Sequence, residues 1–397
     1  MDTIAIIGGG SSAHVLVPFL SKSGFSVNLL TSKPELWNKI ITAHYVLPNN
    51  EYKFSLDGLI DRISNKPEDI VSDADLIIFC MPVYQYRIAL HNIAPYINKN
   101  KKVFLGTIYG QAGFNWMVNE IEMKFTLNNL TTFAIGLIPW ICRTREYGKI
   151  GVTYGSKARN FIALSKREDF EFLNEKFLDE ICFKWFNQGK FTLVDNFLSL
   201  TLSVDNQIIH PSRLYGLYIE NGESWERKED VPFFYRDYTE ISANLLKDLD
   251  DDYSKIRQEI IIKYPNKKFT YMLDYLELER VSYNSSSSNI LESFINSQTL
   301  GQIQTPVIQK DNIWTFDHNH RFFFDDIFYG LCIAKWFAEK LNLEVQTIDK
   351  ILYWAQNLLC ENIIENHKLV IVNDDQNPFQ HGIPTIYGYT EIIELID

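Results

Sequence analysis

Residues 3–20 read TIAIIGGGSSAHVLVPFL, and this stretch decides the fold. A short apolar run is followed by glycines and serines and then by apolar residues at helical spacing, which predicts a strand, a tight turn and a helix. Gly8, Gly10 and Ala13 match the G-x-G-x-x-A pattern of dinucleotide-binding turns, in which the glycines let a pyrophosphate approach the backbone. The helix would follow this turn with its N-terminus toward the phosphates. We therefore expect Gly8, Gly10, Ser11 and Ala13 to bind a dinucleotide cofactor.

The end of the next predicted strand, residues 26–31, bears on which cofactor is bound. Domains that bind NAD usually carry an acidic residue there for the adenosine ribose, and this chain has Thr31, Ser32 and Lys33 instead. Without a carboxylate the 2′-phosphate of NADPH is not repelled, and Lys33 can attract it. The alternative is that Lys33 is an ordinary solvated lysine and that NADH binds through the hydroxyls. The sequence predicts NADPH or NADH, with a mild preference for NADPH, held in part by Thr31 and Lys33.

Strands and helices continue to alternate through the first half of the chain. Further buried strands are predicted within residues 74–82, 102–107 and 132–148. This alternation is typical of a Rossmann-type α/β domain with a doubly wound parallel sheet, which we place at residues 1–191. Because ligands bind at the carboxyl ends of such strands, Pro82 and the loop 108–114 are expected to face the cofactor.

Composition and charge narrow the class of protein. The 397 residues suffice for two domains, and a net charge of −12 argues against nucleic acid as a partner because no basic stripe is available. The five cysteines form no CxxC pair, which favours a reduced, cytoplasmic protein without a metal site. The chain opens directly on a predicted strand rather than a signal peptide, and no apolar run approaches the ~18 to 20 residues that span a bilayer. We expect no membrane partner.

The second half has a different texture, with long amphipathic patterns that predict an all-helical domain over residues 192–397. One helix is expected over residues 347–359, with Thr347 as its N-cap. Another amphipathic run ends in His210 and Pro211. Proline lacks an N–H and disfavours helical geometry in the residue before it, so we expect His210 at or near the end of a helix.

Three segments of the chain resemble the octopine and related opine dehydrogenases. They are PWICRTREYG (139–148), DNQIIHPSRLYG (205–216) and HRFFFDDIFYGL (320–331). The resemblance runs in order from Gly8 to the YGYTEIIELI segment (387–396) and so covers essentially the whole chain. It implies a Rossmann domain joined to a helical substrate domain. It also implies reductive condensation of the amino group of an amino acid with a 2-oxo acid, using NADH or NADPH.

The same resemblance implies a set of site residues in which His210 pairs with Asp326, and Arg321 belongs to the same motif. The set makes chemical sense, because imine formation requires a group that both accepts and donates protons near neutrality, which histidine does. A carboxylate on the other ring nitrogen fixes the tautomer and stabilises the imidazolium. Arg321 offers a bidentate fork for a substrate carboxylate. Asp325, beside Asp326, is assigned to the start of the following helix as an N-cap or first-turn acid.

Two amides complete the predicted substrate site. Asn206 lies one helical turn before His210, on the same face, and can hydrogen-bond substrate or nicotinamide. Gln111 falls in a segment similar to the family's loop near the substrate carboxylate, and a role only in stabilising the loop is the alternative. The remaining histidines, including His318 and His320, lack metal-ligand spacing and are expected on the surface or in loops.

The substrates stay open at this point. Relatives that condense arginine carry an acidic residue where this chain has Gly136, which disfavours a guanidinium, whereas Asp274 favours a basic or polar amine. Pyruvate is the family's usual oxo acid. Two other functions remain as alternatives: a reductase of 2-oxo or 3-hydroxy acids that uses no amine, and a dinucleotide-binding protein without catalysis. The partners are expected to be small molecules, and the protein a monomer or a homodimer.

Overall fold

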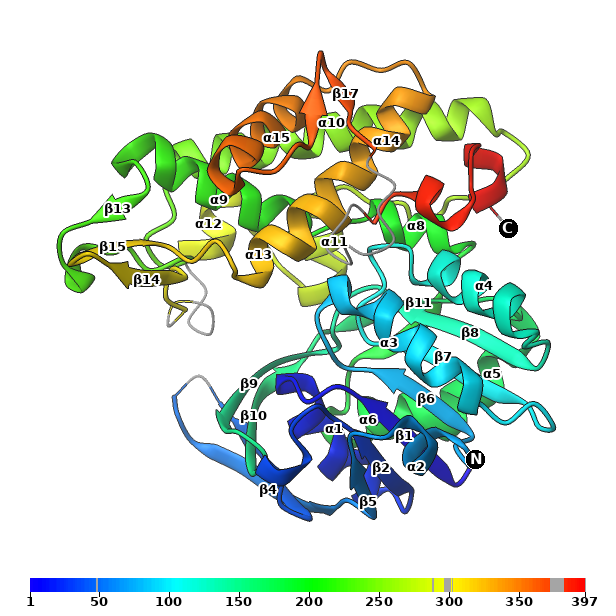
Figure 1. Ribbon diagram of the computed structural model, residues 1–397. Coiled ribbons are helices and arrows are strands. Elements are labelled where there is room, and N and C mark those ends of the chain that lie inside the picture. The colour runs from blue at the N-terminus through cyan, green and yellow to red at the C-terminus, as the bar shows by residue number, and fades with distance from the viewer. Residues whose placement is uncertain (48, 288, 296–300, 302, 372–381, 397) are drawn as a thin grey trace. The chain divides into compact units, whose positions relative to one another are not determined.

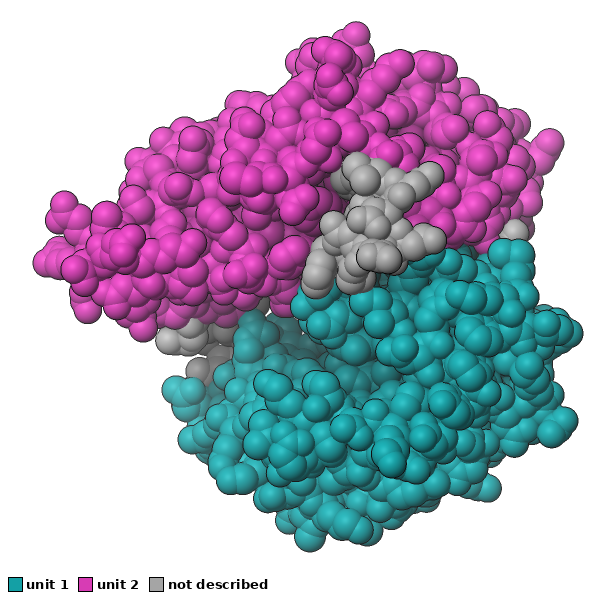
Figure 2. Space-filling view, in the orientation of Figure 1, with its two compact units in different colours: residues 1–201, 397 teal, residues 202–396 magenta. Residues whose placement is uncertain are grey.

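The computed structural model describes residues 1–47, 49–287, 289–295, 301, 303–371 and 382–396. The chain forms two compact units, Met1–Thr201 and Leu202–Ile396 (Figure 2). The first unit ends after Thr201 rather than after residue 191 because strand β12 (Lys190–Leu193) pairs with β11 (Arg159–Leu164) in its sheet. In the described residues no helix is both long and apolar enough to cross a membrane.

The first unit is built on an eight-stranded sheet in the order β12-β11-β8-β7-β6-β1-β2-β5 (Figure 1). From β8 to β5 all neighbouring strands are parallel. Strand β11 pairs antiparallel with β8, and β12, which pairs parallel with β11, runs in the same direction as β11. The strands of this parallel part are β1 (Thr3–Ile7), β2 (Ser26–Leu30), β5 (Arg62–Ser64), β6 (Leu76–Phe79), β7 (Val103–Thr107) and β8 (Leu130–Ile135). The predicted Rossmann-type doubly wound sheet is confirmed, with strand order reversing direction between β1 and β6.

Both faces of this sheet are covered, so its strands are apolar on both sides. Successive side chains of a strand point to opposite faces. Ile78 of β6 belongs to the core that includes helix α1 (Ser11–Lys22), whereas the ring of the next residue, Phe79, lies 5.6 Å from Tyr86 and 5.5 Å from Phe114. Those two rings come from α3 (Tyr86–Ile93) and α4 (Phe114–Phe125). Shorter helices complete the unit: α2 (Pro67–Val71), α5 (Phe170–Leu173), α6 (Asp179–Ile181) and α7 (Phe183–Phe186).

A second, four-stranded sheet in the first unit was not predicted. Its order is β4-β3-β10-β9, from the strands β3 (Ile40–Val46), β4 (Tyr52–Leu59), β9 (Trp140–Glu146) and β10 (Ile150–Ser156). It packs closely on α1: a Cβ on Gly58 would lie 2.4 Å from the Cα of Pro18, and one on Gly151 would lie 2.8 Å from the Cβ of His14. Glycine at both positions is what allows this approach. The sheet thus fixes the helix that begins at the glycine turn.

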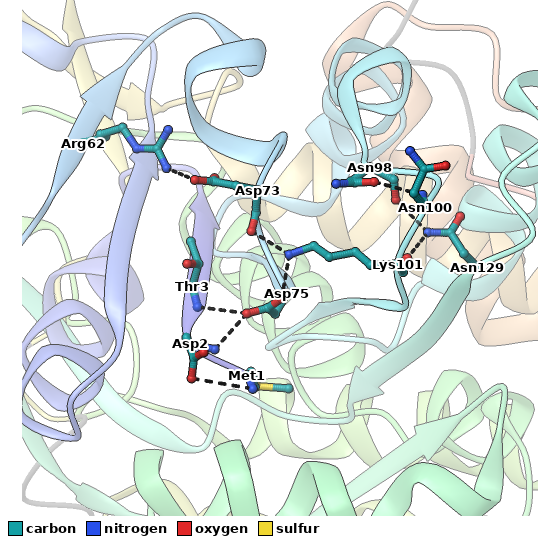
Figure 3. A network of polar contacts seen from close by, with 10 residues as sticks. All are labelled: Met1, Asp2, Thr3, Arg62, Asp73, Asp75, Asn98, Asn100, Lys101 and Asn129. Carbon is teal, nitrogen blue, oxygen red and sulfur yellow. Dashed lines mark hydrogen bonds and ion pairs between the residues drawn. The ribbon is translucent and has the colours of Figure 1, made fainter.

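Polar contacts tie the chain terminus to the amino ends of β1, β6 and β7 (Figure 3). Asp75 Oδ2 accepts hydrogen bonds from the amides of Asp2 and Thr3 at 2.8 and 3.1 Å, and its Oδ1 accepts one from Lys101 at 2.6 Å. Burial alone would raise the pKa of Asp75, but these hydrogen bonds lower it to about 2. The carboxylate therefore stays ionised and links the amino ends of these strands, at the end of the sheet opposite the glycine turn.

The second unit is mainly helical. Its helices are α9 (Asn206–Asn221), α10 (Glu240–Lys263), α11 (Tyr275–Tyr283), α12 (Ile290–Ile295), α13 (Arg321–Phe323), the π-helical segment η8 (Phe324–Leu331), α14 (Cys332–Lys340) and α15 (Gln346–Leu359). Helix α15 takes Val345 as its N-cap, so the predicted cap at Thr347 is wrong. The break between α8 (Phe197–Leu202) and α9 divides the amphipathic run that the sequence predicts as one helix.

The prediction of an entirely helical second domain needs a correction, because two small antiparallel sheets are present. One holds β13 (Ser224–Trp225), β15 (Ile313–Phe316) and β14 (Val307–Lys310), and the other holds β16 (Ile364–Glu365) and β17 (Lys368–Leu369). Each contains a hairpin whose two turn residues have positive φ, Asp311 and Asn312 in one and Asn366 and His367 in the other. Such turns favour tight hairpins. These strands are too short to show an alternating pattern.

Candidate active site

Helix α9 carries the histidine that the sequence singles out. The helix begins at Asn206, where the side chain of the N-cap Asp205 accepts a hydrogen bond from the Asn206 amide at 2.5 Å. His210 lies in the second turn rather than at a helix end, so that prediction is wrong. Pro211 forgoes only the backbone hydrogen bond to the carbonyl of Gln207, and the helix continues to Asn221.

Both ring nitrogens of His210 lie within hydrogen-bond distance of another side chain. Nδ1 is 2.7 Å from Asp326 Oδ2, and Nε2 is 3.0 Å from the hydroxyl of Tyr235. The imidazole is stacked on Phe322, with ring centroids 3.6 Å apart, and its side chain is only 2% exposed. We assign the proton to Nδ1, where the carboxylate accepts it, so that Nε2 accepts from the Tyr235 hydroxyl. The predicted proximity of His210 and Asp326 is present.

Asp326 lies in η8, one turn beyond Phe322, so the same stretch of helix supplies both the carboxylate and the stacking ring. Burial, followed by the neighbouring charge of Asp325, raises the pKa of Asp326 well above its ordinary value. A carboxylate with a raised pKa is a stronger hydrogen-bond acceptor. The Asp326 carboxylate can therefore stabilise a proton taken up by His210.

Arg321 points its guanidinium toward Asp325, not toward Asp326. Its Nη1 lies 4.0 Å from Asp325 Oδ2, and its side chain is 47% exposed. Asp325 is not an N-cap, because His320 caps α13 by accepting a hydrogen bond from the amide of Phe322 at 3.4 Å. Asp325 lies in the first turn of η8, as the alternative first-turn assignment predicted. Burial and the adjacent Arg321 charge lower the pKa of His320 to about 4, which keeps it neutral as a cap. The Arg321 fork is accessible to a substrate carboxylate.

Arg213, three residues after His210 on α9, positions the residues around the imidazole. It is fully buried, and its guanidinium donates to the carbonyls of Phe234, Phe233 and Asp237 at 2.9, 3.3 and 2.6 Å. These carbonyls flank Tyr235. Sequence reasoning missed both Arg213 and Tyr235. The arginine one turn after the histidine was a visible signal, whereas the tyrosine had none.

A cavity of about 580 Å³ lies at the carboxyl ends of β1, β2 and β6 in the first unit. Of the predicted cofactor residues, Gly8, Gly10, Thr31 and Pro82 line it, together with residues including Gly9, Ser32, Asn65, Met81 and Tyr147. Gly8 has φ of +103°, and a Cβ there would lie 2.7 Å from the carbonyl oxygen of Cys80. Only glycine fits this turn, as a dinucleotide-binding turn requires. The lining fits an adenine dinucleotide cofactor.

Three predicted cofactor residues do not line the cavity. The hydroxyl of Ser11 instead accepts a hydrogen bond from the amide of Thr144 at 3.0 Å. Ala13 is fully buried in the core beneath the turn, and Lys33 is exposed. Among the lining residues that the structure describes, none carries a charge. A part in cofactor binding for Ser11, Ala13 and Lys33 stays a prediction.

His14 was expected on the surface or in a loop, and that prediction is wrong. It is fully buried in α1, where Nδ1 lies 2.9 Å from the carbonyl of Gly10 and Nε2 accepts a hydrogen bond from the amide of Gly148 at 2.7 Å. Burial lowers the pKa of His14, so the ring is neutral with its proton on Nδ1. The imidazole thus joins the glycine turn to the β9–β10 hairpin.

The two predicted amides lie in different units. Gln111 is buried between β7 and α4, where its Oε1 accepts a hydrogen bond from the hydroxyl of Tyr109 at 2.9 Å. Asn206 is the first residue of α9, one turn before His210. Their substrate-binding roles stay predictions. No group of His, Cys, Asp or Glu side chains able to hold a metal ion occurs in the described parts of the chain.

Comparison with known proteins shows similarity to opine dehydrogenases. Residues 193–359 match the family model for the NAD/NADP octopine/nopaline dehydrogenase alpha-helical domain. The opine dehydrogenase of Haliotis discus hannai is 22% identical over 98% of this chain and 99% of its own length, and the octopine dehydrogenase of Pecten maximus is 23% identical over 89% of each. The helical domain therefore matches that of the octopine/nopaline dehydrogenases, and the whole chain is similar to opine dehydrogenases. The resemblance seen in the sequence is confirmed.

The fold of this chain is similar to that of a solved octopine dehydrogenase. The structure of octopine dehydrogenase with NADH and L-arginine superposes with a TM-score of 0.81 at 19% identity and covers 100% of this chain and 98% of the other. At that identity the match supports the architecture of a Rossmann domain followed by a mainly helical domain.

Proposed function

We propose that this protein is an opine dehydrogenase that condenses the amino group of an amino acid with a 2-oxo acid and reduces the resulting imine with NADH or NADPH. The observation that carries the proposal is the buried pair of His210 and Asp326, 2.7 Å apart, within the family's helical domain. Pyruvate is the expected oxo acid, since octopine dehydrogenase has been solved with NADH and pyruvate.

His210 is proposed as the acid and base of this reaction. The imidazole takes a proton from the attacking ammonium and returns one to the departing hydroxyl, while Asp326 stabilises the imidazolium between these steps. Arg321, exposed and only 4.0 Å from one carboxylate, holds a substrate carboxylate. Asn206 and Gln111 are the proposed amide ligands of the substrates. When bound, the nicotinamide supplies the hydride.

The cofactor is proposed to bind in the cavity lined by Gly8, Gly10, Thr31 and Pro82. The uncharged lining supports acceptance of both NADH and NADPH, because the cavity presents neither a carboxylate that would repel a 2′-phosphate nor a cation that would require one. Lys33, nearby in sequence and exposed, is the residue proposed to favour NADPH.

The amine substrate is proposed to be an amino acid other than arginine. Gly136 stands where the arginine-using relatives have an acid, and a guanidinium buried without a carboxylate is costly. Asp274 was the residue that favoured a basic or polar amine. It is the N-cap of α11, where its Oδ1 accepts a hydrogen bond from the amide of Glu277 at 2.8 Å. That hydrogen bond gives Asp274 a structural role without any substrate.

The assay mixes the purified protein with NADH or NADPH and pyruvate and adds amines singly, including glycine, alanine, arginine and taurine. Oxidation of the reduced nicotinamide, followed by its absorbance, should depend on the amine. Oxidation that is indifferent to the amine would indicate a simple 2-oxo acid reductase. Cofactor binding without any turnover would indicate a protein that binds the dinucleotide but does not catalyse.

Substitution of either member of the pair should abolish most of the turnover. We expect His210→Gln and Asp326→Asn each to lower kcat by ~10² or more, the usual weight of a positioned acid and base, with cofactor affinity nearly unchanged. His318→Gln, at a histidine in the same unit whose Nε2 lies 3.5 Å from Glu223, serves as the control. Turnover equal to that of the parent in both variants would show that His210 is not the acid and base of the reaction.

A further inference from the structure

The nitrogen of His210 that would meet a substrate already has a neighbour. Nδ1 is directed at Asp326, so under the proposed function only Nε2 is available for proton transfer, and the Tyr235 hydroxyl lies 3.0 Å from it. Phe322 is stacked on one face of the ring at 3.6 Å, and a ring nitrogen exchanges its proton in the plane of the ring, where Tyr235 lies. A substrate must either displace the tyrosine or exchange protons with it.

The surroundings of Tyr235 oppose its displacement. Arg213 holds the backbone carbonyls of Phe234 before it and Asp237 after it. The Tyr235 ring is buried, with the ring of Phe234 at 5.0 Å and that of Phe294 at 5.6 Å. Swinging the phenol away from His210 would disturb this packing, whereas a proton can pass through the hydroxyl without movement of the ring.

We propose that Tyr235 is the substrate-facing end of a proton relay that runs from Asp326 through His210 to the phenol. This inference rests on the proposed opine dehydrogenase activity and assigns its acid and base steps to a particular oxygen atom. The Tyr235 hydroxyl, rather than the imidazole itself, contacts the reacting amine and carbonyl oxygen.

The relay balances the protons of the condensation. As the ammonium of the amino acid gives a proton to the Tyr235 oxygen, the phenol proton moves to Nε2, and the imidazolium is stabilised by Asp326. The amine attacks the ketone carbon to form a carbinolamine, with a second proton moving from nitrogen to oxygen. The phenol then protonates the hydroxyl and recovers its proton from Nε2, so that water leaves and an iminium forms. The bound NADH or NADPH would supply the hydride that reduces the iminium carbon.

Other charged or titratable groups lie near the relay. Asp325 and Arg321 share its helical segment, Asp205 caps α9, and Tyr253 of α10 is buried close enough to interact electrostatically with Asp326. Each of them affects the relay through Asp326. None of these groups replaces the phenol at Nε2.

The experiment compares Tyr235→Phe with Tyr238→Phe in the full-length protein. Tyr238 lies three residues later in the chain and is also buried. Its hydroxyl lies 3.1 Å from the Ser212 hydroxyl, whereas that of Tyr235 lies beside His210. We expect Tyr235→Phe to lower kcat by ~10² or more with little change in KM for the cofactor, and Tyr238→Phe to stay within ~3-fold of the parent. Unchanged or raised kcat in Tyr235→Phe would overturn the relay, because a tyrosine that merely blocks Nε2 slows turnover.

A second measurement separates proton transfer from a structural role. Replacing Tyr235 by 3-fluorotyrosine keeps the ring and the O–H but makes the phenol more acidic. We expect activity to be retained and the basic limb of the kcat–pH profile to move to lower pH, with no such movement for 3-fluorotyrosine at 238. An unmoved profile at 235 would overturn the relay.

A third measurement does not depend on turnover. In protein labelled with ¹⁵N-histidine, the Nε2 resonance of His210 should shift in Tyr235→Phe and not in Tyr238→Phe, because only the former loses the hydrogen bond. If the parent shows no amine-dependent oxidation but this shift is present, the proposed function fails while the hydrogen-bonded chain stands. If the parent turns over and the shift is absent, the relay fails alone.

Discussion

One turn of α9 carries both the proposed catalytic histidine and the arginine that fixes the backbone around its tyrosine neighbour. His210 carries the proposed proton transfer, and Arg213, one turn later, fixes the carbonyls that flank Tyr235. Burial lowers the pKa of Arg213, yet three carbonyls and Ser242 accept its hydrogen bonds. The sequence singled out the histidine, whereas the role of Arg213 became visible only through its contacts with the segment that folds back over the helix.

One residue-scale prediction concerns cofactor choice. Ser32 lines the cavity next to Thr31, in the segment after β2 where NAD-binding domains usually carry an acid. We expect Ser32→Asp to weaken NADPH binding by about tenfold or more through charge repulsion with the 2′-phosphate, and to leave NADH binding within ~3-fold. Cofactor fluorescence titration measures both. Equal losses for the two cofactors would show that Ser32 does not lie at the ribose. Lys33→Ala, measured in parallel, reports how much the predicted lysine adds.

At the scale of elements, helix α15 is capped by another helix. Its own N-cap, Val345, has no side-chain acceptor, and Asp252 of α10 supplies one: its Oδ2 accepts from the amides of Thr347 and Ile348 at 2.8 and 3.2 Å. The sequence predicted α15 to within a residue at its start, since the apolar period is strong. It misplaced the cap because the true acceptor is far away in the chain.

We expect Asp252→Ala to lower the free energy of unfolding by about 1–3 kcal/mol, because two buried amides lose their acceptor. Asp252→Asn keeps an acceptor oxygen and should lose less. Urea denaturation of each variant measures the difference. The neighbouring Asp251→Ala is the control, since that carboxylate is exposed and pairs with Lys247 at the surface. Equal effects at positions 251 and 252 would contradict the capping role.

At the scale of the whole molecule, the chain has two compact units, and the cofactor cavity lies wholly in the first. We expect two thermal transitions in calorimetry. NADH at about 100 times its Kd should stabilise one of them by about 2.7 kcal/mol, through binding to the folded state alone. Gly10→Val, whose Cβ would lie 3.2 Å from the carbonyl of Cys80, should lose this shift. A single transition that moves as a whole would contradict independent melting of the units.

The sequence by itself determined the glycine turn, the parallel strands around it and the helical texture of the second half, because these depend on local periodicity and on residues close together in the chain. The sequence did not predict the four-stranded sheet on α1, because it forms by pairing of segments distant in the chain, residues 40–59 with residues 140–156. Only the tertiary structure revealed the hydrogen bond between Tyr235 and His210 and the capping of α15 by Asp252. Side-chain contacts between remote segments depend on how the chain packs. The pairing of His210 with Asp326, 116 residues later, was anticipated through family resemblance, and its 2.7 Å geometry comes from the packing of α9 against η8.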